Sequence, residues 1–182
     1  MEKRGVLANP TGRLALLAVL TALTTVLTML ISIPVAATQG YINLGDAGVF
    51  LAGLLLGPIG GIAGGAGSAL ADWALGYITW VPITFVVKGL EGTVTGIVFY
   101  ALQPYWRTVP RLLLALILGS FVMVAGYLFV ESLMYGVAAA AVEIPGNIFQ
   151  VAFGSIMSTI VYFAIDRMLQ PYQVKPQTPK EN

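Results

Sequence analysis

The sequence predicts an all-α integral membrane protein with six transmembrane helices, both termini in the cytoplasm, and a short glycine-rich hairpin formed by the second and third helices. Of the 182 residues, 58% are hydrophobic and 9% are charged, whereas about 25% of the residues in a soluble domain are charged. An α-helix needs roughly 20 apolar residues to cross the hydrocarbon core. Four runs qualify as spans, at residues 14–33, 83–102, 112–130 and 144–165.

Two residue types that carry much enzyme chemistry are missing from the sequence. There is no Cys and no His, which excludes disulfides, thiolate chemistry and the side chain most used for proton transfer and metal binding. We therefore expect no cofactor, no metal and no enzymatic activity. We also expect no nucleic-acid partner. The first apolar run is longer than the core of a signal peptide and has no clear A-x-A cleavage site, so we expect it to remain as a helix.

The basic residues decide how many spans lie between residues 46 and 80, a stretch that is too ambiguous to count by length. Three basic clusters flank the long runs: before the first, between the second and third, and after the last. The positive-inside rule places all three on the cytoplasmic side, which requires two spans in this stretch and a turn near Gly57 and Pro58. The clusters are Lys3, Arg4 and Arg13; Arg107 and Arg111; and Arg167, Lys175 and Lys180.

The arms of this hairpin are short and rich in glycine. Residues 47–56 are too few to cross about 30 Å alone, so we expect a tilted or broken segment at residues 57–65. Its small-xxx-small spacing favours close helix packing over a phosphate cradle. Because no G-x-x-x-x-G-K-[ST] motif is present, we expect no ATPase site in this chain. The expected organisation is a cytoplasmic segment at 1–12, a membrane domain at 13–170 and a disordered cytoplasmic tail at 171–182.

Lys88, Glu91 and Asp72 are charged residues that the predicted spans place inside the membrane. A charge at that depth costs at least about 2.5–3.5 kcal/mol unless it is paired or solvated, so these residues indicate a functional site. Lys88 is the one basic residue outside the three clusters, and it lies roughly 9 Å from the outer helix end at about 1.5 Å per residue. Glu91 is its natural partner at i, i+3. A private Lys88–Glu91 ion pair beside a neutral Asp72 is the open alternative.

Other polar and aromatic side chains fall at the same outer level, which predicts a pocket that opens outward rather than a proton path or a pore. Flat rings beside a few hydrogen-bonding groups suit a small planar heterocycle. Two alternatives stay open: a membrane-interface role for Trp80, and solvent exposure for Glu131 and Glu143. The aromatic residues at this level are Tyr41, Trp73, Tyr77, Trp80, Phe85, Tyr127, Tyr135 and Phe149. The predicted substrate-binding residues are Asn43, Asp46, Asp72, Trp80, Lys88, Glu91, Glu131, Asn147 and Gln150.

The first helix carries small residues at Ala15, Ala18 and Ala22. Ala18 and Ala22 form a small-xxx-small pair, which lets another helix approach closely. We predict a docking face for a membrane partner here, because a chain without an energy-coupling motif needs one to move a solute uphill. Internal packing of the same face is the alternative.

These features together resemble the substrate-binding S components of energy-coupling factor (ECF) transporters. The branch that they resemble most is the riboflavin-type S components, which also include hydroxymethylpyrimidine and pyridoxine binders. The resemblance covers about residues 12–168. The stretches of sequence on which the resemblance rests are YINLGD at 41–46, LAGLLLGP at 51–58, GSALADW at 67–73 with Gly76-Tyr77, and PITFVVKGLEG at 82–92.

The resemblance implies a protein of the prokaryotic cell membrane that encloses one vitamin-like molecule near the outer face. It implies that residues 35–46 cap the ligand, and that Ala18 and Ala22 dock a membrane coupling subunit (EcfT-like) joined to two ATPase subunits. It also implies that the loaded S component topples in the membrane to release its ligand inside. We expect a pyridoxine- or hydroxymethylpyrimidine-like ligand. The alternatives are riboflavin, a stand-alone secondary transporter, or a small membrane enzyme that uses Asp72 and Glu91 as acid and base.

Overall fold

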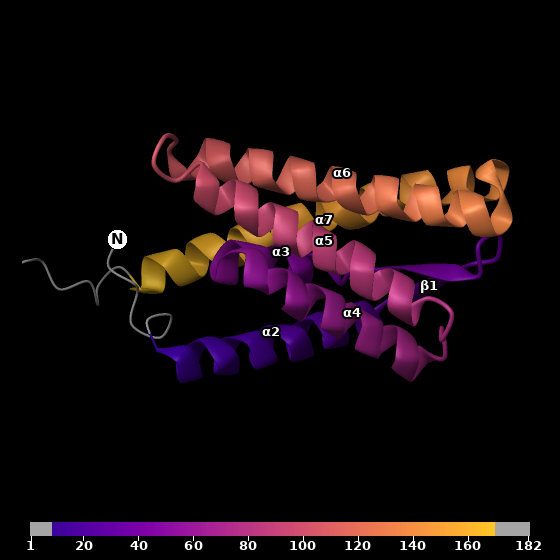
Figure 1. The fold of residues 1–182 in the computed structure, drawn as a ribbon, viewed down its shortest axis with the longest axis horizontal. Helices are drawn as coiled ribbons and strands as arrows, with labels where there is room; N and C mark the ends of the chain where they lie inside the picture. The colour runs from indigo at the N-terminus through magenta and orange to yellow at the C-terminus, as the bar shows by residue number, and fades with distance from the viewer. Residues whose placement is uncertain (1–8, 170–182) are drawn as a thin grey trace, which may run out of the picture.

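The computed structural model describes residues 9–169, which fold into a bundle of helices with one short β-hairpin (Figure 1). The predicted disordered tail, the cytoplasmic segment up to residue 8, and the basic residues Lys3, Arg4, Lys175 and Lys180 lie outside the described residues. The helices are α2 (Pro10–Leu30), α3 (Asp46–Leu56), α4 (Gly60–Leu75), α5 (Val81–Ala101), α6 (Thr108–Tyr135) and α7 (Val137–Leu169), with a 3-10 turn η1 (Gly57–Ile59) and strands β1 (Ser32–Val35) and β2 (Gly40–Asn43).

Within residues 9–169, five stretches are long and apolar enough to cross a membrane, and α3 with α4 counts as one of them, Asp46–Leu75. The predicted break of this stretch is present, because η1 separates the two helices at Gly57–Ile59. The helices then fold back on each other: Gly64 packs against Val49, and Gly60 against the backbone of Ala52. The all-α membrane class is thus confirmed. The count of six crossings and the cytoplasmic location of the termini stay predictions.

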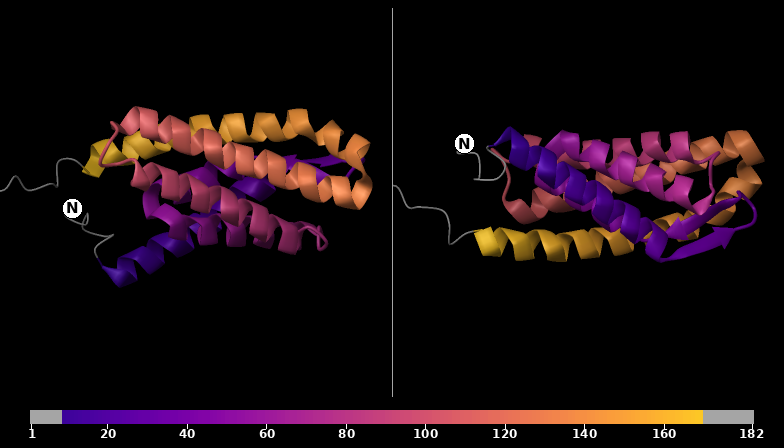
Figure 2. Two further views of the ribbon diagram at one scale, coloured as in Figure 1. Left: turned by 45° about the horizontal axis from the view of Figure 1, so that its top comes forward. Right: turned by 90° about the horizontal axis from the view of Figure 1, so that it is seen from below.

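The predicted loop at residues 35–46 is wrong in part, because it contains half of a β-hairpin. Strands β1 and β2 pair antiparallel, with Ser32 opposite Asn43 and Val35 opposite Gly40. β-Branched and aromatic residues in both strands favour the extended conformation. The turn between the strands places Gln39 at a φ of 56°. The hairpin lies at the end of the bundle where α4 meets α5 and α6 meets α7, as both views of Figure 2 show.

Several helices extend beyond the apolar runs that predicted them. Helix α2 begins at Pro10 rather than residue 14, because the Asn9 side chain accepts a hydrogen bond from the Thr11 amide and Pro10 fits the first helical turn. It ends at Leu30, where the hairpin takes over. Helix α7 is much longer than the predicted 144–165 and continues through Pro145. Apolar length measures the hydrocarbon layer, whereas a helix can continue into the polar interface.

Helix α3 forms the centre of the bundle and is buried along most of its length. Glycines allow the neighbouring helices to approach it and each other. A Cβ at Gly61 would lie 2.3 Å from the Gly89 carbonyl oxygen, and a Cβ at Gly96 would lie 2.3 Å from the Gly57 carbonyl carbon. Backbone contact this close excludes any side chain. The interpretation of this glycine-rich segment as a packing surface is therefore confirmed for α4 and α5.

Candidate functional site

A small buried cavity, with a volume of about 30 Å³, lies at the hairpin end of the bundle. Strand β2 and helices α2, α4, α5, α6 and α7 all contribute to its wall. Seven of the nine predicted substrate-binding residues line it: Asn43, Asp72, Trp80, Lys88, Glu131, Asn147 and Gln150. The other two, Asp46 and Glu91, contact the Lys88 ammonium group from outside the lining. Estimating depth along each predicted helix thus identified residues that the folded protein brings together.

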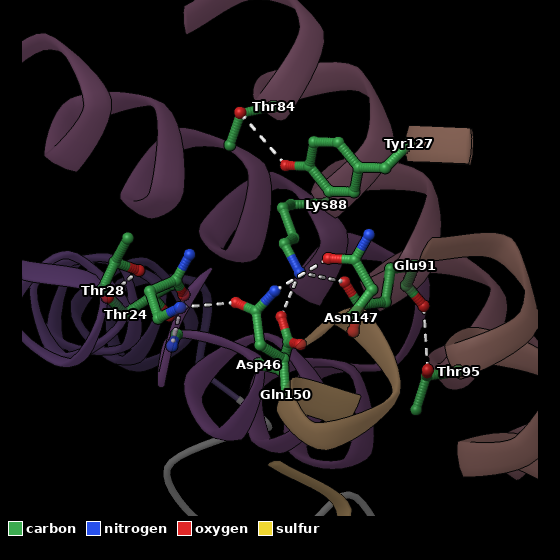
Figure 3. A network of polar contacts seen from close by, with 12 residues as sticks. Thr24, Thr28, Asp46, Thr84, Lys88, Glu91, Thr95, Tyr127, Asn147 and Gln150 are labelled. Carbon is green, nitrogen blue, oxygen red and sulfur yellow. Dashed lines mark hydrogen bonds and ion pairs between the residues drawn. The ribbon is translucent and has the colours of Figure 1, made fainter. Parts of the chain in front are cut away.

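Lys88 is the centre of the site and is 2% exposed. Its ammonium group binds the Asp46 carboxylate and lies 3.2 Å from Glu91 Oε2 (Figure 3). The Lys88–Glu91 pair was predicted, but Asp46 was expected in the outer loop and instead begins α3, fully buried. The correction follows from the chain path: β2 ends at Asn43 and passes almost directly into α3. Lys88 Nζ also lies 5.6 Å from the centre of the Tyr127 ring, within the range of a cation–π contact.

Asp72 forms a second polar group on the cavity wall, held by the hairpin. The Tyr41 hydroxyl donates a hydrogen bond of 2.5 Å to Asp72 Oδ1, and the Tyr41 ring lies 4.5 Å from that of Tyr77. Burial, and then the nearby Asp72 carboxylate, raise the pKa of Tyr41 above its usual range, so its phenol stays protonated and acts as a donor. Strand β2 thereby holds Asp72 through a side chain that the candidate set omitted.

Amide side chains join the end of the hairpin to α7. The Asn43 backbone amide donates to Gln150 Oε1 at 2.8 Å, and Gln150 Nε2 donates to Asn147 Oδ1 at 3.0 Å. Asn43 Oδ1 accepts from the Gly45 amide at 2.8 Å, just before α3 begins. All three side chains line the cavity. They fix the position of the hairpin end in addition to facing the enclosed space.

The hairpin tip packs against α5 and α7 over the cavity. The Thr38 hydroxyl donates to Glu143, and Trp80 Nε1 donates to the Gln39 carbonyl at 3.1 Å. Glu131 and Glu143 are buried, so the alternative of solvent exposure is wrong. The fold corrects it because the tip covers the α6–α7 junction where both carboxylates lie. Trp80 is also buried, beside Tyr127 and Tyr135, so its membrane-interface alternative is wrong as well.

Three of the aromatic residues at this level point away from the cavity. Trp73, Phe85 and Phe149 are exposed on the bundle surface, because a helix presents neighbouring residues to different faces. Sequence reasoning missed five residues of the wall that are small, aliphatic or hydroxyl-bearing: Thr28, Gly40, Ser68, Thr84 and Met123. A signal existed for Thr28, which lies four residues after Thr24 on the same face of a predominantly apolar helix.

The predicted docking residues lie on the outer face of α2. Ala15, Ala18 and Ala22 are exposed, between exposed Leu14, Val19 and Leu23. The buried residues of α2 are Leu20, Thr24 and Thr28, on another face. The internal-packing alternative is therefore wrong within the described part of the chain.

The match to a known family decides the kind of protein that this site belongs to. Residues 9–167 match the family model described as "ECF-type riboflavin transporter, S component". The chain belongs to this family. The predicted resemblance is confirmed, and with it the prediction of a multi-pass prokaryotic membrane protein without enzymatic activity. This protein is therefore the S component of an ECF transporter for a vitamin or a vitamin precursor.

Two relatives and one solved structure are similar to this S component. A Lactococcus lactis subsp. cremoris (strain MG1363) protein named thiamine precursor transporter HmpT is 32% identical over 157 residues, which cover 85% of this chain and 88% of that protein. A Pyrococcus woesei protein described as "Uncharacterized protein in gap 3'region" is 40% identical over 148 residues, covering 81% and 97%. A solved structure described as "Structure and mechanism of the S component of a bacterial ECF transporter" has a TM-score of 0.60 at 24% identity and covers 92% of this chain and 100% of that chain, which shows the shared fold.

Proposed function

We propose that this S component captures a pyridoxine- or hydroxymethylpyrimidine-like vitamin or precursor in the cavity beneath the β-hairpin. The observation that carries the proposal is the composition of the cavity wall, where Tyr41, Trp80 and Tyr127 lie beside hydrogen-bonding groups. Small-molecule sites commonly have a few convergent polar groups and volumes of about 300–1,000 Å³, so this cavity, of about 30 Å³, must open further when the ligand enters. Rings would hold a planar ligand between apolar faces, and Lys88, Asp72, Asn147 and Gln150 would bind its substituents.

A thiamine-precursor transporter among the relatives supports a small heterocycle. The family description names riboflavin, which is the second candidate. Riboflavin has a larger ring system and a ribityl chain, and the cavity wall already holds the inward-facing side chains of six elements. A cavity of about 30 Å³ has to open less for the smaller ligand, which favours that ligand.

We further propose that the hairpin end faces outward and that α3 and α4 give the bundle six membrane-embedded helices. Helix α2 begins, α7 ends and α5 joins α6 at the opposite end of the bundle (Figure 1). Arg13, Arg107, Arg111 and Arg167 lie in or beside these segments. Their common location matches the positive-inside rule and supports an outward-loading site.

The ligand class is tested by native mass spectrometry of the purified protein, followed by calorimetry with hydroxymethylpyrimidine, pyridoxine and riboflavin. We expect a co-purified adduct of vitamin size and tight binding of one of the first two compounds. Binding of riboflavin alone would replace the proposed ligand by the second candidate. No adduct together with no binding of any of the three compounds would contradict the proposal.

Coupling to the membrane subunit and two ATPases is proposed to use the exposed face of α2 around Ala18 and Ala22. Replacing Ala18 with Leu adds bulk where a partner helix would approach the backbone. We expect Ala18→Leu to reduce ligand uptake in cells that contain the coupling module at least about tenfold, because a misfitting interface loses more than about 1.4 kcal/mol. Ligand binding by the purified variant should stay unchanged.

The matched control is Ala152→Leu, which makes the same substitution at an exposed position of α7. It should leave both uptake and binding near the wild-type values. Loss of ligand binding in Ala18→Leu would show that this face stabilises the bundle instead of receiving a partner.

A further inference from the structure

We infer that the cavity selects a ligand that donates hydrogen bonds and carries no negative charge, so that it takes a vitamin as the free alcohol or amine and rejects its phosphate ester. This inference rests on the proposed function and adds the charge and hydrogen-bonding character of the ligand. Three features of the wall carry it: its ammonium and phenol groups already have protein partners, two of its carboxyl oxygens have none, and its acidic residues outnumber its one cation.

Most of the strong donors on the cavity wall are already engaged. The Lys88 ammonium group binds two carboxylates, from Asp46 and Glu91. The Tyr41 hydroxyl donates to Asp72, and the Tyr127 hydroxyl donates to Thr84 Oγ1 at 3.1 Å. A ligand that carries only acceptors can use the third N–H of Lys88 and the Ser68 hydroxyl, which is buried without a partner, but it must displace a protein partner to use the others. Replacing an existing charged bond by a new one brings little net free energy.

By contrast, two acceptor atoms on the same wall have no hydrogen-bond partner. Asp72 Oδ2 and Glu131 Oε2 are buried without any hydrogen-bond partner, on side chains of residues that are 2% and 1% exposed. Both residues line the cavity. A buried carboxylate oxygen without a donor is costly, so a ligand N–H or O–H placed here relieves a penalty that the empty protein carries. Among the described residues, the one buried side-chain nitrogen without a partner is Arg111 Nε, which is not part of this wall.

The charges of the wall point the same way. Lys88 is the one cation among the lining residues, against the carboxyl groups of Asp72, Glu131 and Glu143. Two further carboxylates, Asp46 and Glu91, already share Lys88. A phosphate group would add about one and a half to two negative charges to this set. Like charges at short range in a medium of low dielectric constant repel strongly, and no free cation on the described wall offsets that repulsion.

Calorimetry on the purified full-length protein tests the inference with three pairs: hydroxymethylpyrimidine, pyridoxine and riboflavin, each against its phosphate ester. We expect the phosphate ester of the compound that binds to be at least about a hundredfold weaker, because the ester loses a charged hydrogen bond and gains repulsion. The acetate ester of the same hydroxyl controls for size. The phosphate ester should bind at least about tenfold more weakly than the acetate ester, since only the phosphate adds charge.

The outcomes separate this inference from the proposed function. A phosphate ester that binds as tightly as the alcohol overturns the inference and leaves a vitamin-binding S component in place. Equal weakening by acetate and phosphate overturns the role of charge. Failure of all three unphosphorylated compounds to bind overturns the inference together with the proposed ligand class.

Two variants test the acceptors directly. Glu131→Gln and Asp72→Asn keep the shape of each side chain but replace its carboxyl group by an amide. Each should weaken binding of the alcohol about tenfold or more and reduce the ratio between the affinities for the alcohol and for the phosphate ester. The matched control is Asp166→Asn, at the opposite end of α7, which should change neither affinity. Two folded variants with unchanged affinities for alcohol and ester would overturn the inference. If one variant fails to fold, the other and the wild-type ester series still decide it.

Discussion

Replacing Lys88 with Met is expected to lower the free energy of unfolding by about 3–5 kcal/mol, the usual cost of removing one partner from a buried ion pair. The substitution leaves Asp46 and Glu91 buried without their cation, and both residues are 0% exposed. Thermal unfolding in detergent, followed by fluorescence-detected size exclusion, measures the loss. Ligand affinity of the remaining folded protein should also fall, because Lys88 lines the cavity.

A triple variant separates charge balance from ligand contact. Lys88→Met combined with Asp46→Asn and Glu91→Gln removes the cation and both carboxylate charges, so most of the lost stability should return. Ligand binding should stay weak, since the amide groups do not replace the ammonium group. A Lys88→Met protein with wild-type stability would contradict the central ion-pair arrangement. A destabilised variant with unchanged affinity would show that Lys88 only balances its two carboxylates.

Gly96→Ala is the second substitution with a large expected effect, about 3 kcal/mol or more of lost stability, at the upper end for overpacking. The new Cβ would lie 2.3 Å and 2.4 Å from the carbonyl carbon and oxygen of Gly57, beside η1. These are backbone atoms at a tight turn, so no side-chain rotation can relieve the contact. Yield of monodisperse protein and its thermal unfolding temperature measure the effect.

The control for this substitution is on the same helix. At Gly89, the nearest atom to an added Cβ is 3.6 Å away, which is an ordinary contact. Gly89→Ala should be neutral or slightly stabilising, because Ala is better than Gly in a helix by about 1 kcal/mol. Similar destabilisation by both alanines would mean that α5 and η1 are not packed as described.

The sequence predicted the membrane class, the break near Gly57 and most of the cavity wall, because each follows from a strong physical constraint. Membrane spans need apolar length, buried charges need partners, and depth along a helix follows from the rise per residue. Counting along each helix therefore brought Asp72, Lys88 and Gln150 to one level before their contacts were known.

The remaining features depend on tertiary contacts that periodicity does not contain. The β1–β2 hairpin places Thr38 against Glu143, and the passage from β2 into α3 brings Asp46 to Lys88. A linear count treated Asp46, Glu131 and Glu143 as residues near water, whereas all three are buried. Rotation about the helix axis was also missing from the depth argument. It explains why Trp80 lines the cavity and Trp73, at a similar depth, is exposed.

The Lys88–Asp46–Glu91 cluster has a consequence for how the protein enters the bilayer. Asp46 is carried by α3 and its cation by α5, so the α3–α4 hairpin carries an uncompensated carboxylate until α5 has been synthesised. Leaving a single charge in the hydrocarbon layer costs several kilocalories per mole. We therefore expect stable insertion of α3 to wait for α5, so that residues 46–101 enter the membrane as one cooperative unit during biogenesis rather than helix by helix.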